Sequence, residues 1–282
     1  MNIFSPNTKE ELQKAIDLYY NDESNALEIY GSINTWDTSQ ITDMSCMFEE
    51  ATSFNQDISN WNVSNVTNME HMFSDAELFN QDISLWDVSN VVDMSCMFSG
   101  ATSFNQYISN WNVSNVKHMI GIFEEAKSFN QDISNWNVSN VTNMKSMFYS
   151  ADSFNSDISN WNVSNVTNMS SMFFFTSSFI GDLSLWDVSN VTNMENMFHN
   201  ANSFNSDISN WNVSNVTNME HMFHNANSFN NNLSNWDVSN VKTNNKIFLG
   251  SMIKDEYKPK FNNLDKLDLS YNNKLLKRII KK

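Results

Sequence analysis

The chain has 282 residues, of which 13% are aromatic and 17% charged, and its 32 acidic and 16 basic residues give a formal net charge of −16. Five glycines and two prolines are too few for a collagen-like or linker-type chain. The aromatic content excludes a disordered acidic tail, no run of 18 apolar residues predicts a membrane-spanning helix, and the acidic charge disfavours nucleic acid as a partner.

Residues 1–32 predict a helical N-terminal cap. Thr8-Lys9-Glu10-Glu11 is a capping box, with Thr8 at the N-cap position and Glu11 three residues later. The helix that follows has one apolar face, made of Leu12, Ala15, Ile16, Tyr19 and Tyr20. We expect this face to cover the open end of the first repeat, because a stack of repeats needs a cap at each end.

Residues 33–248 are predicted to form nine coils of 25 residues. The nine tryptophans share this spacing and lie at Trp36, Trp61, Trp86, Trp111, Trp136, Trp161, Trp186, Trp211 and Trp236. A short fixed period predicts units that stack and bury one continuous core. Burial of the tryptophan column is therefore favoured over an exposed ridge that would stack on sugars or bases.

The apolar spacing changes within each repeat. Trp61 and Val63 alternate with polar residues, as in a strand, and a turn follows them. Between Val66 and Phe79 the apolar residues recur with a spacing near 3.6, which predicts a short helix over residues 69–77. The expected fold is therefore an α/β repeat solenoid in which each coil has one or two short strands and a short helix.

The repeat resembles a known one. It reads Trp-Asx-Val-Ser-Asn-Val-Thr-Asn-Met-x-x-Met-Phe-x-x-Ala-x-Ser-Phe-Asn-x-Asp-Ile-Ser and extends over about residues 30–248. This unit is similar to the 25-residue repeat of the BspA-like leucine-rich-repeat surface proteins, which also occurs in mycoplasma lipoproteins of unknown function. The resemblance implies a leucine-rich-repeat-like solenoid and, for some members, a role in surface adhesion.

Residues 249–282 are predicted to add a leucine-rich-repeat-type coil and a basic C-terminal cap. Leu264-x-x-Leu267-x-Leu269-x-x-Asn272 fits the leucine-rich-repeat template. The tail over residues 274–282 is basic and amphipathic. Either it caps the stack with a solvated basic rim, or it makes a weak contact with an anionic membrane or RNA.

One column of carboxylates is a weak candidate for calcium. Stacked carboxylates repel one another unless a cation or hydrogen bonds offset the repulsion. The alternative is that each carboxylate accepts hydrogen bonds from the nearby backbone, because the glycine-rich nonapeptide of calcium-binding repeats is missing. The column, broken by Tyr107 and Asn232, contains Asp57, Asp82, Asp132, Asp157, Asp182 and Asp207.

The sequence predicts no catalytic residues, no cofactor and no resident metal. No histidine recurs beside the serine column that follows each tryptophan, so a nucleophilic serine has no base. His199 and His224 occupy equivalent positions with His221 nearby, and we interpret them as surface variation rather than a zinc site. Cys46 and Cys96 lie two coils apart, too far for a disulfide, and are expected to be reduced.

The leading functional hypothesis is a non-enzymatic scaffold that binds a protein partner through the variable positions of its repeats. The triple Phe173-Phe174-Phe175 indicates either a contact patch or local repacking. The interaction candidates are Phe174, Phe175, Lys145, Tyr149, His199 and His224. A BspA-like surface adhesin is the alternative, but no secretory signal or lipobox cysteine is seen near Met1, so an intracellular location, or one in a viral particle or host cytoplasm, is favoured over the cell surface.

Overall fold

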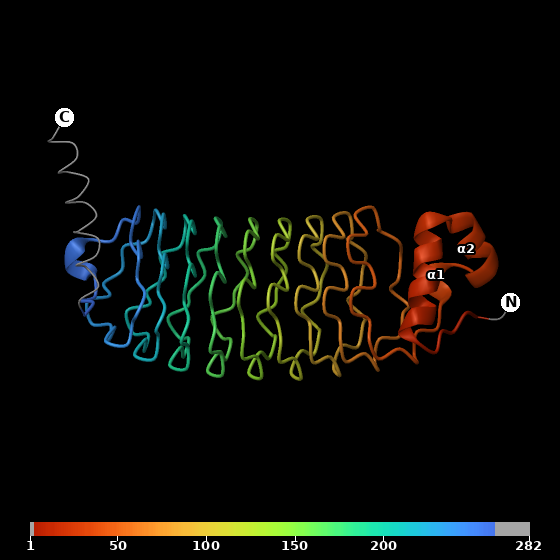
Figure 1. The fold of residues 1–282 in the computed structure, drawn as a ribbon, viewed down its shortest axis with the longest axis horizontal. Coiled ribbons are helices and arrows are strands. Elements are labelled where there is room, and N and C mark those ends of the chain that lie inside the picture. Colours follow the sequence, from red (N-terminus) through yellow and green to blue (C-terminus); the bar gives the residue numbers. More distant parts are fainter. Residues whose placement is uncertain (1–2, 263–282) are drawn as a thin grey trace, which may run out of the picture.

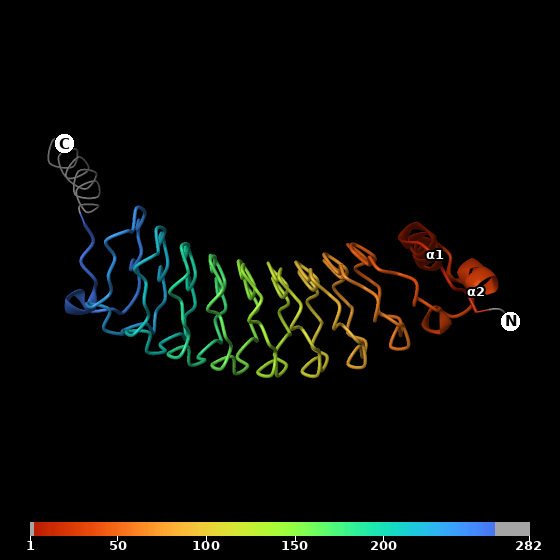
Figure 2. The ribbon, with the colours of Figure 1, turned by 90° about the horizontal axis from the view of Figure 1, so that it is seen from below.

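The protein is a long stack of coils with two helices at its N-terminal end. The computed structural model describes residues 3–262. The coils follow one another in sequence order along the long axis (Figure 1). A view turned by 90° shows that the stack is bowed into an arc (Figure 2).

Two α-helices form the N-terminal end, α1 (Lys9–Asn21) and α2 (Glu23–Tyr30). Thr8 is the N-cap of α1, and its hydroxyl accepts a hydrogen bond from the Glu11 amide at 3.2 Å. The Glu11 carboxylate accepts from the Asn7 amide at 2.7 Å, one residue before the cap. The sequence analysis missed α2, a helix of eight residues that bears one buried residue, Ala26.

The apolar face of α1 lies against the first coil. Leu12, Ala15, Ile16 and Tyr19 are buried, whereas Tyr20, also predicted on this face, is 48% exposed. The Tyr19 ring packs edge-on against Trp36 with centroids 6.1 Å apart. A short 3-10 helix, η1 (Ile33–Thr35), then leads into the first coil.

The prediction of strands and a helix in every coil is wrong. Within residues 3–262, no α-helix lies beyond Tyr30, and no strand is formed. Neighbouring coils are joined instead by isolated parallel bridges, one for each adjacent pair, from Asp43↔Asn68 to Asn218↔Thr243. The remaining element is the 3-10 helix η2 (Asp255–Tyr257).

Two left-handed residues in each coil explain why the helix does not form. Positive φ angles of +51° to +80° recur at the positions of His71 and Asp75 in all nine coils. In the turn closed by the Met72 amide and the Met69 carbonyl, His71 is the third residue, where type II turns need a positive φ. A left-handed residue interrupts the right-handed path of an α-helix, so the segment becomes a series of turns.

Amide groups in this segment alternate between two kinds of partner. The amides of Met72 and Ser74 donate to carbonyls three residues earlier, at 3.2 and 3.1 Å. The amides that alternate with them donate to the next coil, from His71 to Ser95 at 2.9 Å, from Phe73 to Met97 at 2.9 Å and from Asp75 to Ser99 at 2.7 Å. Because half of the donors leave the coil, neither a helix nor a strand ladder is completed, yet the groups are paired.

The core consists of repeated columns of identical residues. The tryptophans are 2–5% exposed. From Trp61 to Trp236, each indole N–H donates to the carbonyl 28 residues earlier, at 2.9–3.3 Å. Beside them, paired phenylalanines stack within each coil, as Phe73 and Phe79 do at 3.9 Å. The tryptophan column therefore fills the core and joins neighbouring coils by hydrogen bonds.

The coils are farther apart along the Phe79 column than along the Phe73 column, where ring centroids of equivalent residues are 5.3–5.9 Å apart. Along the Phe79 column the ring centroids are 5.8–6.2 Å apart. Beside this column, the side-chain oxygen of Asn55 accepts from the Asn80 amide at 2.9 Å, and most later coils repeat this contact. Asparagine side chains thus bridge the wider gap between backbones.

The predicted C-terminal repeat falls largely outside the described part of the chain. The segment from Leu264 to Asn272 and the basic tail at 274–282 lie beyond residue 262. Before that point, Phe248, Tyr257 and Phe261 are partly buried against the core. The Leu233 amide donates to the Tyr257 carbonyl at 2.8 Å, which attaches this segment to the coil before it.

Candidate functional site

Several outward positions vary among the coils, and we call the column that contains Tyr149 and Phe174 the variable column. Each member follows a phenylalanine of the core and precedes a left-handed residue, and every member except the buried Ser74 is at least partly exposed. The members are Glu49, Ser74, Ser99, Glu124, Tyr149, Phe174, His199, His224 and Leu249. The column changes from acidic or hydroxyl side chains to aromatic ones after Glu124.

Four successive members, Tyr149, Phe174, His199 and His224, form what we call the aromatic ladder. The Tyr149 and Phe174 rings are stacked with centroids 4.7 Å apart and an interplanar angle of 2°. Phe174 meets His199 edge-on at 4.6 Å, and His199 lies 4.5 Å from His224. All four side chains are partly exposed, so the ladder presents a continuous row of rings across four coils.

Phe175 extends the ladder sideways in an unfavourable backbone conformation. Its ring lies 4.8 Å from Phe174, is 46% exposed, and its φ is +56°. A bulky residue at positive φ is an outlier, and here burial offsets only part of the strain. Glycine and asparagine occupy the same position in other coils, as at Gly100 and Asn200.

The ladder lies on the inner side of the arc. Equivalent rings are 4.5–4.7 Å apart where Tyr149 meets Phe174 and His199 meets His224, against 5.8–6.2 Å along the Phe79 column. Coils that converge toward one column place it on the concave face of the bow seen in Figure 2.

Acidic residues border the Tyr149 end of the ladder. Partial burial, then the charges of Glu125 and Glu124, raise the pKa of Tyr149. Burial and Glu125 raise the pKa of Glu124, and Lys145 opposes this shift. Lys145 is exposed and lies in the same coil as Tyr149, one coil after Glu124. It therefore stands beside the acidic residues and not in the row of rings.

A third histidine joins the other end. His221 lies 5.4 Å from His224 and 5.9 Å from His199, measured between ring centroids. Burial, then His224 and His221, lower the pKa of His199 to about 4. Burial, His221 and Lys246 also lower the pKa of His224. His199 and His224 are therefore largely uncharged at neutral pH.

The structure brings five of the six interaction candidates into one cluster, Phe174, Phe175, Tyr149, His199 and His224. The 25-residue spacing of Tyr149, Phe174, His199 and His224 is visible in the sequence. Sequence analysis grouped them with other variable positions and did not predict that their rings stack.

The candidate calcium column is occupied by backbone contacts. In each of its six aspartates, Oδ1 accepts from the amide two residues later, at 2.9–3.0 Å. Hydrogen bonds from the Ser84 and Ser134 side chains and amides lower the pKa of Asp82 and Asp132. Among residues 3–262, no group of three or more histidine, cysteine, aspartate or glutamate side chains is arranged to hold a metal ion as it stands.

Cys46 and Cys96 are free thiols on either side of His71 in one column. Burial and Glu49 raise the pKa of Cys46 to about 11, and burial and Glu124 do the same for Cys96. The thiolate is the reactive form of cysteine, so both are poor nucleophiles at neutral pH.

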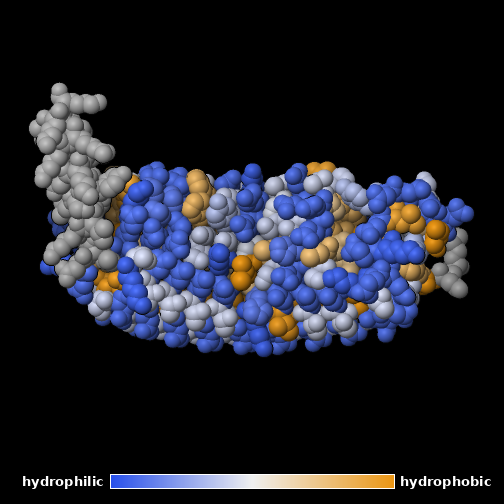
Figure 3. Space-filling model, in the orientation of Figure 1, coloured by the Kyte–Doolittle hydropathy of each residue, from blue (hydrophilic) through white to orange (hydrophobic). Residues whose placement is uncertain are grey.

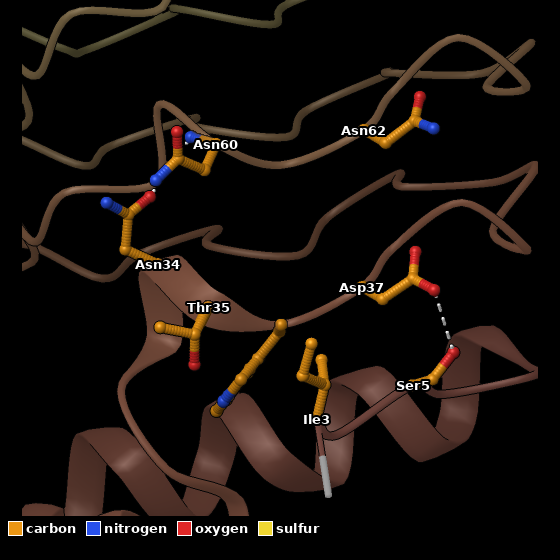
Figure 4. A pocket seen from close by; sticks show the side chains of 8 residues that line it. Ile3, Ser5, Asn34, Thr35, Asp37, Asn60 and Asn62 are labelled. Atoms are coloured by element: carbon orange, nitrogen blue, oxygen red, sulfur yellow. Dashed lines mark hydrogen bonds between the residues drawn. The ribbon is translucent and has the colours of Figure 1, made fainter.

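An open pocket lies where the N-terminal segment meets the first coils (Figure 4). Its polar groups already have partners, since Ser5 donates to Asp37 at 3.3 Å and the Asn60 amide donates to Asn34 at 3.0 Å. These contacts hold the segment against the stack. The lining residues are Ile3, Ser5, Asn34, Thr35, Trp36, Asp37, Asn60 and Asn62.

Apolar residues appear elsewhere on the surface as separate spots. Figure 3 shows a mainly hydrophilic face with scattered apolar patches. Leu85 and Leu185 are the most exposed of the large apolar residues, at 88% and 75%. Across the described part of the chain, no helix combines the length and apolarity needed to cross a bilayer.

Comparison with known proteins gives a family but no activity. Searches of curated proteins and of solved structures each returned no match. The family described as "Mycoplasma protein of unknown function, DUF285" matches three overlapping segments, residues 17–120, 83–182 and 154–262. These segments cover the helical cap in part and every coil, which agrees with a repeat protein. The chain therefore belongs to this mycoplasma repeat family of unknown function.

Proposed function

We propose that the protein is a non-enzymatic interaction module that binds a protein partner through the aromatic ladder and Phe175. The observation that carries the proposal is Phe175, a phenylalanine left 46% exposed at positive φ beside a row of stacked rings. Folding alone gives no reason to keep it, since the neighbouring coils have Ser150 and Asn200 there. Aromatic side chains are enriched among residues that dominate binding energy.

The charge of the protein indicates the chemistry of the partner. The net charge is −16, and Glu124 and Glu125 border the ladder. A partner surface with apolar side chains surrounded by lysine or arginine would complement both features. Exposed aromatic rings and acidic groups together favour arginine, whose guanidinium group can stack on ring faces and pair with carboxylates.

The test compares two double variants as bait in a pull-down from the source cells. F174S/F175S removes the exposed rings, and L85S/L185S removes two exposed leucines elsewhere. Proteins retained by the wild type and by L85S/L185S but lost with F174S/F175S are the expected result, with a melting temperature close to that of the wild type. Direct titration of the retained protein then gives the change in affinity.

Equal retention by all three baits would contradict the proposal. A large drop in melting temperature for F174S/F175S would show that the two rings support the fold. In that case F175N alone, which copies Asn200, removes the exposed ring while keeping a residue suited to positive φ.

A BspA-like surface adhesin is the second candidate, and it rests on the resemblance of the 25-residue repeat, since the matching family is described as of unknown function. It differs from the first in where the ladder would act. Protease treatment of intact source cells separates the two, because an adhesin is cleaved before lysis and an internal scaffold only afterwards.

A further inference from the structure

Three of the five histidines gather at one end of the aromatic ladder. His221 takes the left-handed position of its coil, His224 follows it by three residues, and His199 lies one coil earlier. The three ring centroids are 4.5, 5.4 and 5.9 Å apart. We propose that His199, His221 and His224 bind a late first-row divalent metal ion of the Zn²⁺ or Ni²⁺ class.

The spacing of the rings suits a single ion. An imidazole nitrogen lies about 2.0–2.1 Å from zinc, so three rings on one tetrahedral ion have centroids ~5 Å apart. The observed separations of 4.5–5.9 Å bracket that value. In residues 3–262 no group of three or more histidine, cysteine, aspartate or glutamate side chains is placed to hold a metal ion. Binding therefore requires the three side chains to rotate, and the short ring separations are the reason to expect that rotation is enough.

Two of the rings have a nitrogen available. His199 Nδ1 lies 3.0 Å from Asn196 Oδ1. Because a carbonyl oxygen only accepts, Nδ1 carries the proton in this contact, and Nε2 keeps its lone pair. In metal sites, histidine ligands are oriented by such a hydrogen bond from the ring nitrogen that does not bind the metal. His224 Nδ1 is buried without a hydrogen-bond partner, so an ion would satisfy an atom that the fold leaves unpaired.

Charges around the trio act in both directions. Glu195 and Glu220 lie one residue before Asn196 and His221, and a carboxylate or water can fill the fourth position of a three-histidine site. Lys246, which follows His221 in its column, weakens the attraction for a cation. Imidazole ligands suit zinc, nickel and copper, whereas magnesium prefers oxygen ligands, so Mg²⁺ is the matched negative control.

The test is titration of the full-length reduced protein with ZnCl₂, NiCl₂ and MgCl₂ by isothermal calorimetry. Thermal melts with and without EDTA accompany it. The variants are H199S, H221N and H224S, each of which copies a residue at the equivalent position of another coil and so suits the backbone there. The controls are H71N and H118N, which remove the two histidines outside the trio.

We expect binding of Zn²⁺ and Ni²⁺, a rise in melting temperature that EDTA reverses, and no response to Mg²⁺. Each trio variant should weaken affinity on the order of tenfold or more, while H118N and H71N bind as the wild type does. Absence of binding at millimolar Zn²⁺ and Ni²⁺ would overturn the proposal. So would binding that survives H199S/H224S, or that is lost in H71N, which would place the ion beside Cys46 and Cys96. Metal affinity is measured without any protein partner, so this result is independent of the proposed function.

Discussion

The phenylalanine column of the core and the variable column beside it differ in how much change they tolerate. Phe73, Phe98 and Phe123 repeat with 0% exposure, whereas the very next residues are Ser74, Ser99 and Glu124. A core side chain must fit between its copies in the coils above and below, so one residue type suits every coil. The outward position meets solvent on one side, and acidic, hydroxyl, aromatic and imidazole groups all fit there. The stack therefore repeats its shape through the core and varies its chemistry at outward positions such as this column.

The two sides of the arc differ in how the coils are joined. On the ladder side equivalent rings approach to 4.5–4.7 Å, and backbone amides reach the next coil directly. Along the Phe79 column the spacing is 5.8–6.2 Å, and asparagine side chains bridge the backbones beside a few direct bonds, such as that from the Leu78 amide to the Thr52 carbonyl at 3.1 Å. The asparagine column thus supports the curvature that brings the ladder rings together.

Removing one core ring should have the largest effect. Phe123 packs 3.8 Å from Phe129 and 5.9 Å from both Phe98 and Phe148. Phe123→Ala leaves a cavity in the middle of the stack and should lower the free energy of unfolding by about 3–5 kcal/mol, measured by urea denaturation. Tyr107→Ala, which removes a ring that is 49% exposed, is the control. Similar losses for both variants would mean that the core and surface columns do not differ as described.

Relieving the strained residue of the ladder should stabilise the protein. Phe175→Asn places a residue that tolerates positive φ where a phenyl ring now stands at +56°. We expect a gain of about 1 kcal/mol in the same urea assay, reduced by the lost contact with Phe174. Ser150→Asn, at the same position one coil earlier, is a control for the backbone preference alone. A stability loss in Phe175→Asn would show that the ring contributes more by packing than it costs in strain.

A missing bridge on the wide side of the arc can be restored. Ile180 occupies the position of the bridging asparagines, is 62% exposed, and has no side-chain acceptor for the next coil. Ile180→Asn should add one hydrogen bond and about 0.5–1 kcal/mol of stability. Leu185→Asn also replaces an exposed apolar residue by asparagine but lies outside this column. Equal effects of both substitutions would remove the case for the bridge.

Acid should weaken the aspartate turns, with the smallest effect. The hydroxyls and amides of Ser84 and Ser134 lower the pKa of Asp82 and Asp132 in the folded protein. A lowered folded-state pKa means that the stabilisation is present above the unfolded pKa of about 4 and is lost as pH falls below it. In D82N/D132N the acceptor remains but cannot be protonated. The variant should therefore lose less stability than the wild type between pH 5 and pH 3 in urea titrations, and a parallel decline would contradict this account.

Much of the fold follows from the sequence. The period of the tryptophans defines the coils, and the capping box identifies α1. The apolar residues of the predicted pattern between Met69 and Phe79 are all buried. The helix predicted over residues 69–77 is wrong because its apolar spacing also fits a chain of turns that points the same side chains inward. The short α2 gave little signal, since its one buried residue is Ala26.

The candidate site was predicted in its members more than in its arrangement. Tyr149, Phe174, Phe175, His199 and His224 were selected as variable residues, and they do lie together. Their stacking depends on the distance between coils on the concave face, which no single repeat specifies.

By itself, the sequence determined which residues are buried and how often they recur, because burial of apolar side chains depends on their order along the chain. Only the tertiary structure decided the backbone of each coil. The His71 amide finds its partner at Ser95 in the next coil, 2.9 Å away, and not within its own segment. Once neighbouring coils supply these partners, left-handed residues such as His71 and Asp75 are held in place. Conformation here is set by contacts between repeats, so local spacing alone predicted the wrong element.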